Sequence, residues 1–363
     1  MRSPLWLLSP AFDLAAFLLP PLVSLAACAA LAAAGALDQP VGPVPWLLAV
    51  VLVDVAHVYA TAYRVYAEPA ELRRRPVLYA TVPLGCYAVG VALHAVSSLT
   101  FWRALAYLAV VHFVRQQAGW IALSRHRDGA LPLRWRRIDR LLDDAAIYAG
   151  TLYPLLWWHA HLPRRFHWFL EGDFAGGLPP ALVRALAPVY LALGLLWLLR
   201  QVHRALVGHG IHVGKALVML GTWATWYVGI VALDSDLAFT LTNVLTHGVP
   251  YLLLVWRYRT ARHEPDQPRT VRSFALFYAP LAVAALLEEG LWDRLLWHEH
   301  GMLFPLPSVE PSAAALTLLV PLLALPQATH YLLDAWIWRM AQNPGLARHL
   351  GLQTPPSPAW PLQ

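Results

Sequence analysis

Long apolar runs alternate with short polar segments along almost the whole chain. A helix that crosses a bilayer needs about 20 consecutive apolar residues, and each run reaches roughly that length. The ten runs lie at approximately 10–36, 45–66, 76–100, 101–124, 139–161, 180–203, 211–233, 237–258, 273–295 and 312–338. No soluble domain interrupts the series. The pattern predicts one all-α integral membrane domain over residues 1–363, a polytopic transmembrane helical bundle of about ten spans.

The composition excludes an ordinary soluble protein, because 58% of the 363 residues are hydrophobic and only 13% are charged. A formal net charge of +6 would suit a nucleic-acid-binding protein. The arginines, however, lie between the hydrophobic runs rather than on one basic face, so we expect no nucleic-acid partner. Cys28 and Cys86 both fall inside predicted spans, and we expect them to pack rather than to form a disulfide or bind metal.

Positive charge alternates from one predicted connection to the next. Most of the 27 Lys and Arg residues follow even-numbered runs, as Arg73, Arg74 and Arg75 do after the second and Arg136 and Arg137 after the fourth. Cytoplasmic loops carry an excess of Lys and Arg. The alternation predicts that both termini are cytoplasmic and that the protein is multi-pass in the cytoplasmic (inner) membrane.

Four of the even-numbered runs carry a histidine one helical turn from another polar residue. On a helix, such a pair shares one face. The pairs are Asp54 with His57, His112 with Gln116, Asn243 with His247, and His330 with Asp334. These runs all cross in the same direction, and the spacing to the next arginines places the four histidines roughly 10–20 Å below the cytoplasmic boundary. Ionisable groups at that depth are costly and therefore indicate function.

We expect the four histidines to share a transition-metal site. Imidazole suits iron, copper and zinc, and residue pairs on facing helices build metal sites in bundle cores. Asp54 and Asp334 are either further ligands or acceptors that orient the imidazoles, whereas Gln116 and Asn243 lie beyond the ligands. The pattern leaves one ion or two open. The alternative for each pair is a private interhelical hydrogen bond.

Other polar residues near this layer have candidate roles. Tyr331 and Thr246 are the first candidates to contact a substrate, and Arg115 is a deep cation that we expect to balance Asp54 or Asp334, or to bind an anionic head group.

Two further groups of ionisable residues lie outside the four pairs. Glu288 and Glu289 either line a proton or cation path or, as we favour, cap a helix end at the interface. His203, His209 and His212 leave open a second metal site on the cytoplasmic side.

The segments DVAHVYATAYR, VVHFVRQQ, NVLTHGVPY and THYLLDAWIWR resemble the sites of integral-membrane non-haem iron enzymes. That group includes the fatty-acid desaturases and hydroxylases and the bacterial carotene-cleaving dioxygenases. The HxxxH and HxxHH boxes of desaturases are absent, and single histidines on several spans are closer to the carotene-cleaving family. The resemblance implies an oxidoreductase that uses non-haem iron and dioxygen on a lipid or isoprenoid substrate, with a redox partner.

Two other functions compete with a non-haem iron enzyme. Four histidines at one depth also suit bis-histidine haem ligation in a membrane electron carrier. A transporter would instead use the buried charges as coupling groups. Those charges are Asp54, Arg115, Glu288, Glu289 and Asp334.

Overall fold

The computed structural model describes residues 5–37, 39, 41–127, 132–343 and 345–352, and over these residues the chain forms helices and no β-strand. Eight helical segments are long and apolar enough to cross a membrane. They are Pro10–Ala33, Pro43–Arg64, Pro76–Val96, Pro180–Leu206, Val213–Ala232, Asp236–His263, Val271–Trp297 and Ala313–Ile337. The prediction of an all-helical, multi-pass membrane protein is confirmed.

Two other long helices correspond to the fourth and fifth predicted spans. These are α7 (Ser98–Ser124) and α8 (Leu133–Ala160). They are more polar than the eight apolar segments, and the first turns of α8 carry charges at Arg136 and Asp139. The count of ten crossings therefore stays a prediction, although each predicted run is helical over most of its length.

Most spanning segments consist of more than one labelled piece. The first segment joins α1 (Pro10–Asp13) to α2 (Leu19–Ala33), and the second joins α3 (Pro43–Pro45) to α4 (Ala56–Arg64). The others contain α6 (Pro76–Val96), α9 (Pro180–Leu206), α10 (Val213–Trp226), α11 (Asp236–Phe239) with α12 (Leu245–His263), and α13 (Val271–Trp292). Short helices α5 (Pro69–Arg74) and α16 (Leu346–Leu350) lie outside the spans.

The tenth predicted run is not one continuous helix. It breaks at Ala324 into α14 (Ala313–Leu323) and α15 (Leu325–Ile337). Pro326, which follows the break, has no backbone N–H and its ring clashes with a preceding carbonyl in a helix interior. The break sets the direction of α15, the helix that carries His330.

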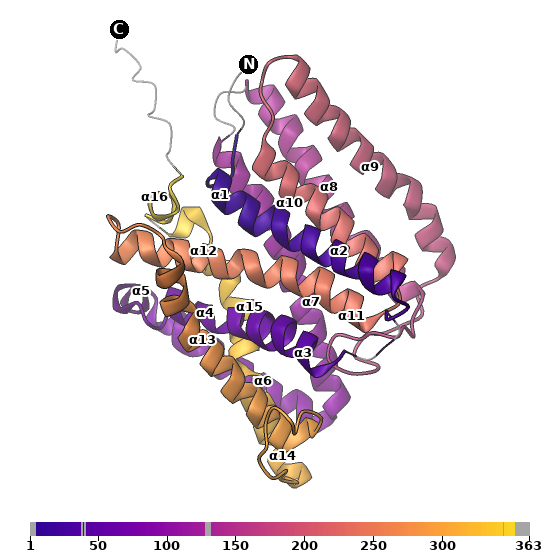
Figure 1. Cartoon of the computed structure of the whole chain (residues 1–363), viewed down its shortest axis with the longest axis vertical. Helices are drawn as coiled ribbons and strands as arrows, with labels where there is room; N and C mark the ends of the chain where they lie inside the picture. The colour runs from indigo at the N-terminus through magenta and orange to yellow at the C-terminus, as the bar shows by residue number, and fades with distance from the viewer. Residues whose placement is uncertain (1–4, 38, 40, 128–131, 344, 353–363) are drawn as a thin grey trace.

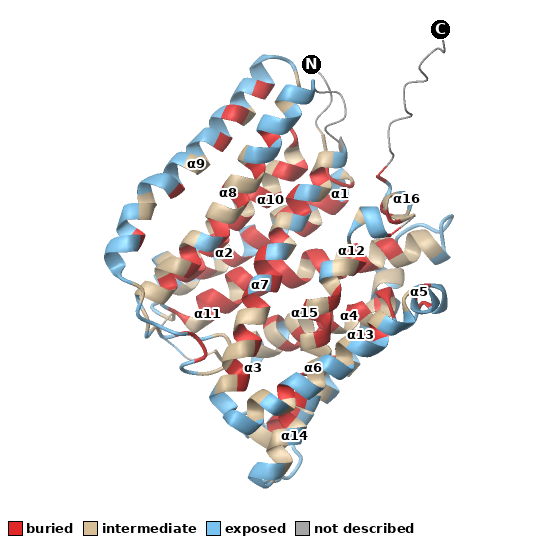
Figure 2. Cartoon of the chain, turned by 180° about the vertical axis from the view of Figure 1, so that it is seen from behind, coloured by how far each residue is buried: buried red, intermediate tan, exposed pale blue. Residues whose placement is uncertain are grey.

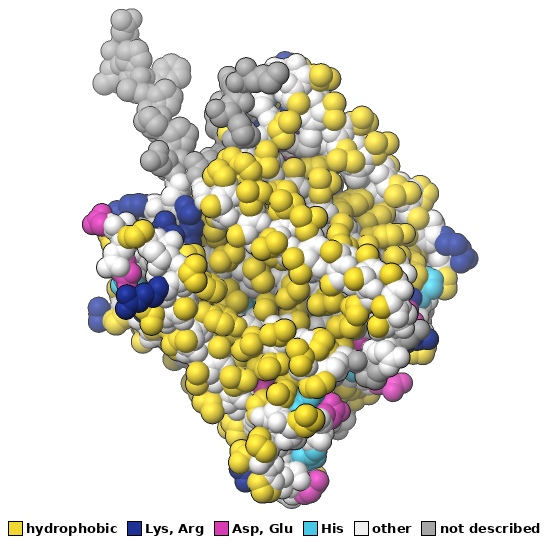
Figure 3. All heavy atoms as spheres, in the orientation of Figure 1, with side chains coloured by type: hydrophobic (Ala, Val, Ile, Leu, Met, Phe, Trp, Pro, Cys, Tyr) yellow, Lys and Arg dark blue, Asp and Glu magenta, His cyan; other side chains and the backbone are white. Residues whose placement is uncertain are grey.

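Burial divides the helices into an inner and an outer group. Figure 2 shows long buried stretches on α7 and α10, whereas α9 and much of α13 are exposed. Helix α9 packs along α8 at the margin of the molecule (Figure 1). Hydrophobic side chains cover most of the face in Figure 3, and Lys and Arg gather at the edge near α5 and the end of α12. An apolar surface of this kind suits a lipid environment.

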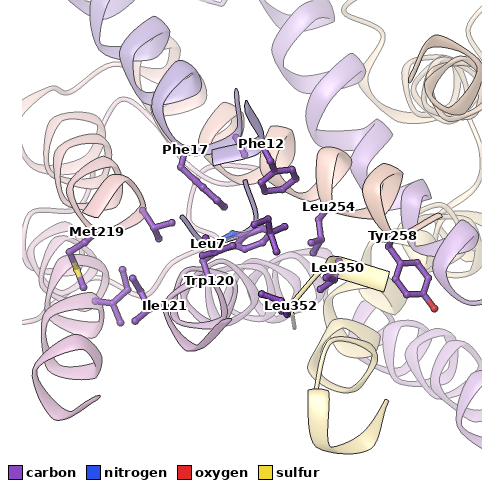
Figure 4. Packing of buried hydrophobic residues seen from close by; sticks show 14 of the residues in the cluster. Leu7, Phe12, Phe17, Trp120, Ile121, Met219, Leu254, Tyr258, Leu350 and Leu352 are labelled. Atoms are coloured by element: carbon purple, nitrogen blue, oxygen red, sulfur yellow. The ribbon is translucent and has the colours of Figure 1, made fainter. Parts of the chain in front are cut away.

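The two ends of the described chain meet in one hydrophobic cluster. Leu7 and Phe12 near the N-terminus pack with Leu350 and Leu352 near the C-terminus, around Trp120 of α7 (Figure 4). Both ends therefore lie on one side of the molecule, as an even number of crossings requires. Both cysteines are free, as expected.

A buried ion-pair network joins α8 to α9 and α10. Asp139 accepts from Arg200 at 2.5 Å and from Arg204 at 2.7 Å. One turn further along α8, Asp143 accepts from Lys215 at 2.7 Å, and both of these side chains are almost completely buried. A charge at such depth is tolerated because its partner is fixed in place.

We expect Asp143→Ala to lower the free energy of unfolding by about 3–5 kcal/mol, because it leaves the Lys215 ammonium buried without this carboxylate. The matched control is Asp144→Ala, since Asp144 is 39% exposed and pairs with Arg125 near the surface; we expect a change of about 1 kcal/mol or less. Equilibrium unfolding in detergent measures both. Equal losses in the two variants would contradict the structural role of the buried pair.

Candidate metal centre

Two of the four histidines follow π-helical segments. The segment Trp46–Val55 precedes His57 on α4, and the segment Thr240–Val244 precedes His247 on α12. In a π-helix the hydrogen bonds run from i to i+5, so each turn is wider and the next residues rotate about the axis relative to a continuous α-helix. π-Helical turns recur at functional sites. Here they set the directions of His57 and His247.

A glycine allows the helices of these two histidines to approach closely. At Gly248, the residue after His247, an added Cβ would lie 2.7 Å from the Val53 side chain and 3.1 Å from the Val53 carbonyl oxygen. Any larger residue would push α12 away from the second spanning segment. The His57 and His247 rings lie 4.7 Å apart because these backbones are so near.

The four predicted histidines form one buried cluster. His57, His112, His247 and His330 each offer a ring nitrogen, and these four atoms all lie within 4.8 Å of one another. None of the four side chains is more than 5% exposed. Four helices that are far apart in the sequence (α4, α7, α12 and α15) therefore contribute to one site, as the shared depth predicted.

Each imidazole ring contacts two others, so the four rings form a closed cycle. Going around it, the centroids of neighbouring rings are 4.7 Å apart for His57–His247, 5.0 Å for His247–His112, 4.6 Å for His112–His330 and 4.8 Å for His330–His57. Neighbouring planes are steeply inclined, by 64° to 85°. No planar macrocycle fits between neighbouring rings at this spacing. For the two remaining pairs, the nitrogens of the other two rings lie within 4.8 Å, inside the area that a macrocycle would need. The geometry therefore favours a compact ion over haem.

The nitrogen spacing matches that of ligands on a single ion. With metal–nitrogen bonds of about 2.1 Å, adjacent ligand nitrogens lie about 3.0–3.4 Å apart and opposite ones about 4.2 Å apart. The Nε2 atoms of His57 and His247 are separated by 3.1 Å. The largest separation in the cluster, 4.8 Å, exceeds the opposite-ligand value only slightly. Movements of a few tenths of an ångström at each ring would bring all four onto one ion.

A hydrogen-bond chain identifies the protonated nitrogen of His330. Tyr251 donates its hydroxyl proton to Oδ1 of Asp334 at 2.7 Å. Because the Tyr251 proton is used in that bond, the Thr61 hydroxyl, which lies 2.9 Å from the Tyr251 oxygen, donates to it. The Thr61 oxygen in turn accepts a hydrogen bond from Nδ1 of His330 at 2.7 Å. His330 therefore carries its proton on Nδ1, which leaves the Nε2 lone pair free to bind a metal.

Unpaired atoms support the same conclusion. Nε2 of His330 and Nε2 of His112 are buried and have no hydrogen-bond partner within the described part of the chain. An unpaired acceptor in an apolar core is costly, and a bound cation removes that cost. The donor set therefore fits a transition-metal ion.

Both carboxylates lie behind the rings rather than among the ligands. Oδ1 of Asp54 is 3.5 Å from Nδ1 of His57, and Oδ1 of Asp334 is 3.8 Å from Nδ1 of His330. In each pair the carboxylate faces Nδ1, whereas the Nε2 atom of the same ring faces the cluster. Neither carboxylate lies where a direct ligand would. Asp334 orients His330 through Tyr251 and Thr61, whereas Asp54 makes no hydrogen bond to His57 Nδ1.

The two amides touch the backbone rather than the rings. Gln116 donates to the His247 carbonyl oxygen at 3.4 Å, and Asn243 donates to the Phe239 carbonyl oxygen at 3.2 Å. The ring of Phe113 stacks on that of His247, with the two ring centroids 3.5 Å apart and an angle of 7° between the ring planes. No pattern in the sequence predicted that Phe113, the residue after His112, would stack on His247.

The three residues predicted to be catalytic have different surroundings in the structure. Tyr331 is buried and its ring centroid lies 4.9 Å from that of His112, which suits a residue beside the site. Thr246 donates to the Thr242 carbonyl oxygen of its own helix at 2.6 Å. For Arg115 the expected pairing with Asp54 or Asp334 is wrong, because its side chain is exposed and donates to the Tyr148 hydroxyl; the other expectation, that it binds an anionic head group, stays a prediction.

The second histidine group does not assemble into a metal site. His212 caps α10 by accepting from Lys215 N at 3.1 Å, and its other ring nitrogen lies 3.1 Å from the Ser124 carbonyl oxygen. His203 pairs with Arg200 at 2.6 Å. These nitrogens already serve local hydrogen bonds. Within the described residues, only the four-histidine group has metal-binding geometry.

A cavity of about 440 Å³ reaches Asp54 from the loops that precede α9 and follow α13. Glu288 and Glu289 both line it, and Glu288 accepts hydrogen bonds from Tyr59 at 2.6 Å and Trp292 at 3.2 Å. The expectation that these glutamates cap a helix end at the interface is therefore wrong, because α13 continues beyond them and they face the cavity.

One of these loops is held in place by Asp173, which accepts from the backbone N–H groups of Trp168 and Phe169. Burial raises the pKa of the Asp173 carboxyl above its ordinary value, and these backbone hydrogen bonds oppose the shift.

No protein-family model matches this chain, and no curated protein or solved structure matches it either. The function is therefore argued from the site itself.

We expect Tyr251→Phe to weaken metal binding by about 10–100-fold, because it breaks the hydrogen-bond chain that keeps the proton on Nδ1 of His330. Tyr63→Phe is the matched control, since Tyr63 packs on Phe277, away from the cluster. Competition with a chromophoric chelator measures both affinities. An unchanged affinity in Tyr251→Phe would show that the chain does not orient the ligand.

Proposed function

We propose that this protein is an integral-membrane metalloenzyme, a non-haem iron oxidoreductase that acts on a lipid or isoprenoid substrate. The observation that carries the proposal is the convergence of four buried histidine nitrogens within 4.8 Å of one another inside a bundle of apolar helices. Each further step rests on the chemistry of that donor set.

The ligands favour a catalytic metal over a structural one. Structural zinc sites are commonly closed and rich in cysteine, whereas imidazole ligands suit iron, copper and zinc alike. Four neutral imidazoles leave the full positive charge on the ion. Iron, when bound, would supply redox chemistry and open positions at which dioxygen binds. The resemblance of the four histidine segments to the sites of integral-membrane non-haem iron enzymes selects iron among the metals that imidazole favours, and with it desaturation, hydroxylation or dioxygenation.

The residues of the chain have distinct tasks in this proposal. His57, His112, His247 and His330 hold the ion, while the Thr61–Tyr251–Asp334 chain orients the ring of His330 and Asp54 places a carboxylate 3.5 Å from Nδ1 of His57. Tyr331, which packs against His112, is the first residue expected to contact a substrate.

The substrate class follows from the predicted depth of the site. At roughly 10–20 Å below the membrane boundary, a reactive centre is level with acyl or isoprenoid carbons. A lipid could therefore react without leaving the bilayer, and a soluble substrate would gain nothing from this location.

A cation transporter is the second candidate, because three of the five charges expected for it line one cavity: Asp54, Glu288 and Glu289. A transporter also needs access from the opposite side. There Arg64, which is buried, packs over Tyr258 and donates to the Ile337 carbonyl oxygen at 2.9 Å. One closed end also fits one state of an alternating-access transporter, so the observation that favours the enzyme is the convergence of the four histidine nitrogens.

We expect about one iron per chain in wild-type protein purified in detergent, and an at least tenfold lower content in His330→Ala, because one of four ligands is lost. His94→Ala is the matched control, since His94 lies on α6 outside the cluster and its loss should leave the metal content unchanged. Elemental analysis gives the stoichiometry, and an absorption spectrum without a Soret band supports non-haem iron. Equal metal in wild type and His330→Ala would refute the shared site.

Product analysis tests the reaction itself. Iron-loaded protein is placed in vesicles that contain an unsaturated phospholipid and an isoprenoid hydrocarbon, under ¹⁸O₂ with a reductant. Mass spectrometry should detect incorporation of ¹⁸O or the loss of two hydrogens in wild type, and neither in His330→Ala. Full iron occupancy with no change in either lipid would count against an oxidase acting on these two lipid classes.

A further inference from the structure

The cavity beside the metal centre is strongly acidic. We call it the acidic chamber, defined by the residues that line its volume of about 440 Å³. Its lining contains no Lys or Arg among the described residues. The carboxylates in the lining are Asp54, Glu171, Asp236, Glu288, Glu289 and Glu299.

These oxygen donors are distributed along the chamber from its mouth to its inner end. Glu171 and Glu299 are exposed in the two loops at the mouth, where His300 also stacks on Trp46 at 3.7 Å. Glu288 and Glu289 follow on α13. Asp54, at the inner end, belongs to the segment that leads into His57. A cation that moved inward would meet a carboxylate at each stage.

The inner end has an unsatisfied polar contact with the metal centre. Oδ1 of Asp54 is buried and has no hydrogen-bond partner within the described chain, and the same is true of Nδ1 of His57, 3.5 Å away. The His57 side chain is 1% exposed. These two atoms lie where the chamber meets the four-histidine cluster. Because buried polar atoms normally have hydrogen-bond partners, their lack of one indicates that a polar or charged species binds there.

The walls strengthen the field of these carboxylates. Trp102, Phe113, Trp168 and Trp292 are among the aromatic residues of the lining. Clefts with one sign of charge and walls of low dielectric constant concentrate counter-ions and accelerate their arrival. An acyl or isoprenoid chain would not favour so many carboxylates.

We propose that the acidic chamber is the entry route by which a hydrated divalent metal ion reaches the four-histidine centre. The inference rests on the proposed function, because it assumes that the histidines bind a metal. The mouth lies in the loops that the charge pattern places opposite the arginine-rich side. In this arrangement Glu288 and Glu289 receive the ion, and Asp54 passes it to the neighbouring imidazoles. No electron or proton transfer is needed for this step.

The test is the rate at which metal-free protein takes up Co(II), followed by the visible absorption of the histidine-bound ion. We expect Glu288→Gln combined with Glu289→Gln to load at least tenfold more slowly than wild type while reaching the same final stoichiometry. Glu264→Gln is the matched control, because this exposed carboxylate lies between α12 and α13, outside the chamber. It should load at the wild-type rate.

A second variant guards against misfolding of the first. Glu171→Gln combined with Glu299→Gln changes only exposed positions at the mouth, and it should also slow loading. In addition, salt should slow wild-type loading more than that of either double variant, because it screens the carboxylate field.

The outcomes separate the two proposals. If wild type takes up no Co(II), the metal centre itself is refuted and the entry route fails with it. If wild type loads but both double variants load at the same rate as Glu264→Gln, the metal centre stands and the route is overturned. A loss of final stoichiometry with an unchanged rate would assign the glutamates to ion binding rather than entry, and would also overturn the proposal.

Discussion

The mutual approach of four imidazoles in an apolar core is the constraint on which the rest of this structure depends. Ring nitrogens that converge within 4.8 Å cannot all satisfy one another, because most of them present lone pairs. A cation at their centre would convert this repulsion into bonding. The groups behind the rings are arranged accordingly: Asp334, through Tyr251 and Thr61, holds the His330 proton on the nitrogen that faces away from the cluster.

The helices around the site keep these rings in position. Arg64 joins the end of α4 to the end of α15 through its hydrogen bond to the Ile337 carbonyl oxygen. Its guanidinium also forms an ion pair with Glu71, with Nη1 of Arg64 3.4 Å from Oε2 of Glu71. His57 and His330 lie on α4 and α15, so the contact between Arg64 and Ile337 limits their relative movement. Further out, the buried pair of Asp143 and Lys215 holds α8 against α10. Buried charges thus serve as fixed joints in a protein whose apolar surfaces alone specify little about helix position.

The acidic chamber and the apolar helix surfaces offer different environments on two sides of one centre. The chamber presents carboxylates to polar species, whereas hydrophobic side chains cover most of the face seen in Figure 3. A metal-dependent enzyme that acts on lipids needs both, since its ion comes from water and its substrate from the bilayer. Asp54 both lines the chamber and faces His57, so in our proposals it belongs to the metal centre and to the entry route.

The sequence by itself determined the membrane class, the helical segments and the identity of the four histidines, because hydrophobic length and the position of a polar residue within a span are local properties. It also indicated the shared depth of His57, His112, His247 and His330, through the alternation of arginines. Only the tertiary structure decided which partners meet. The exposure of Arg115, the position of Glu288 and Glu289 at the cavity, and the order of the four histidine rings in the cluster depend on helix rotation. That rotation is set by π-helical turns, the break at Ala324 and the close contact at Gly248, none of which follows from periodicity.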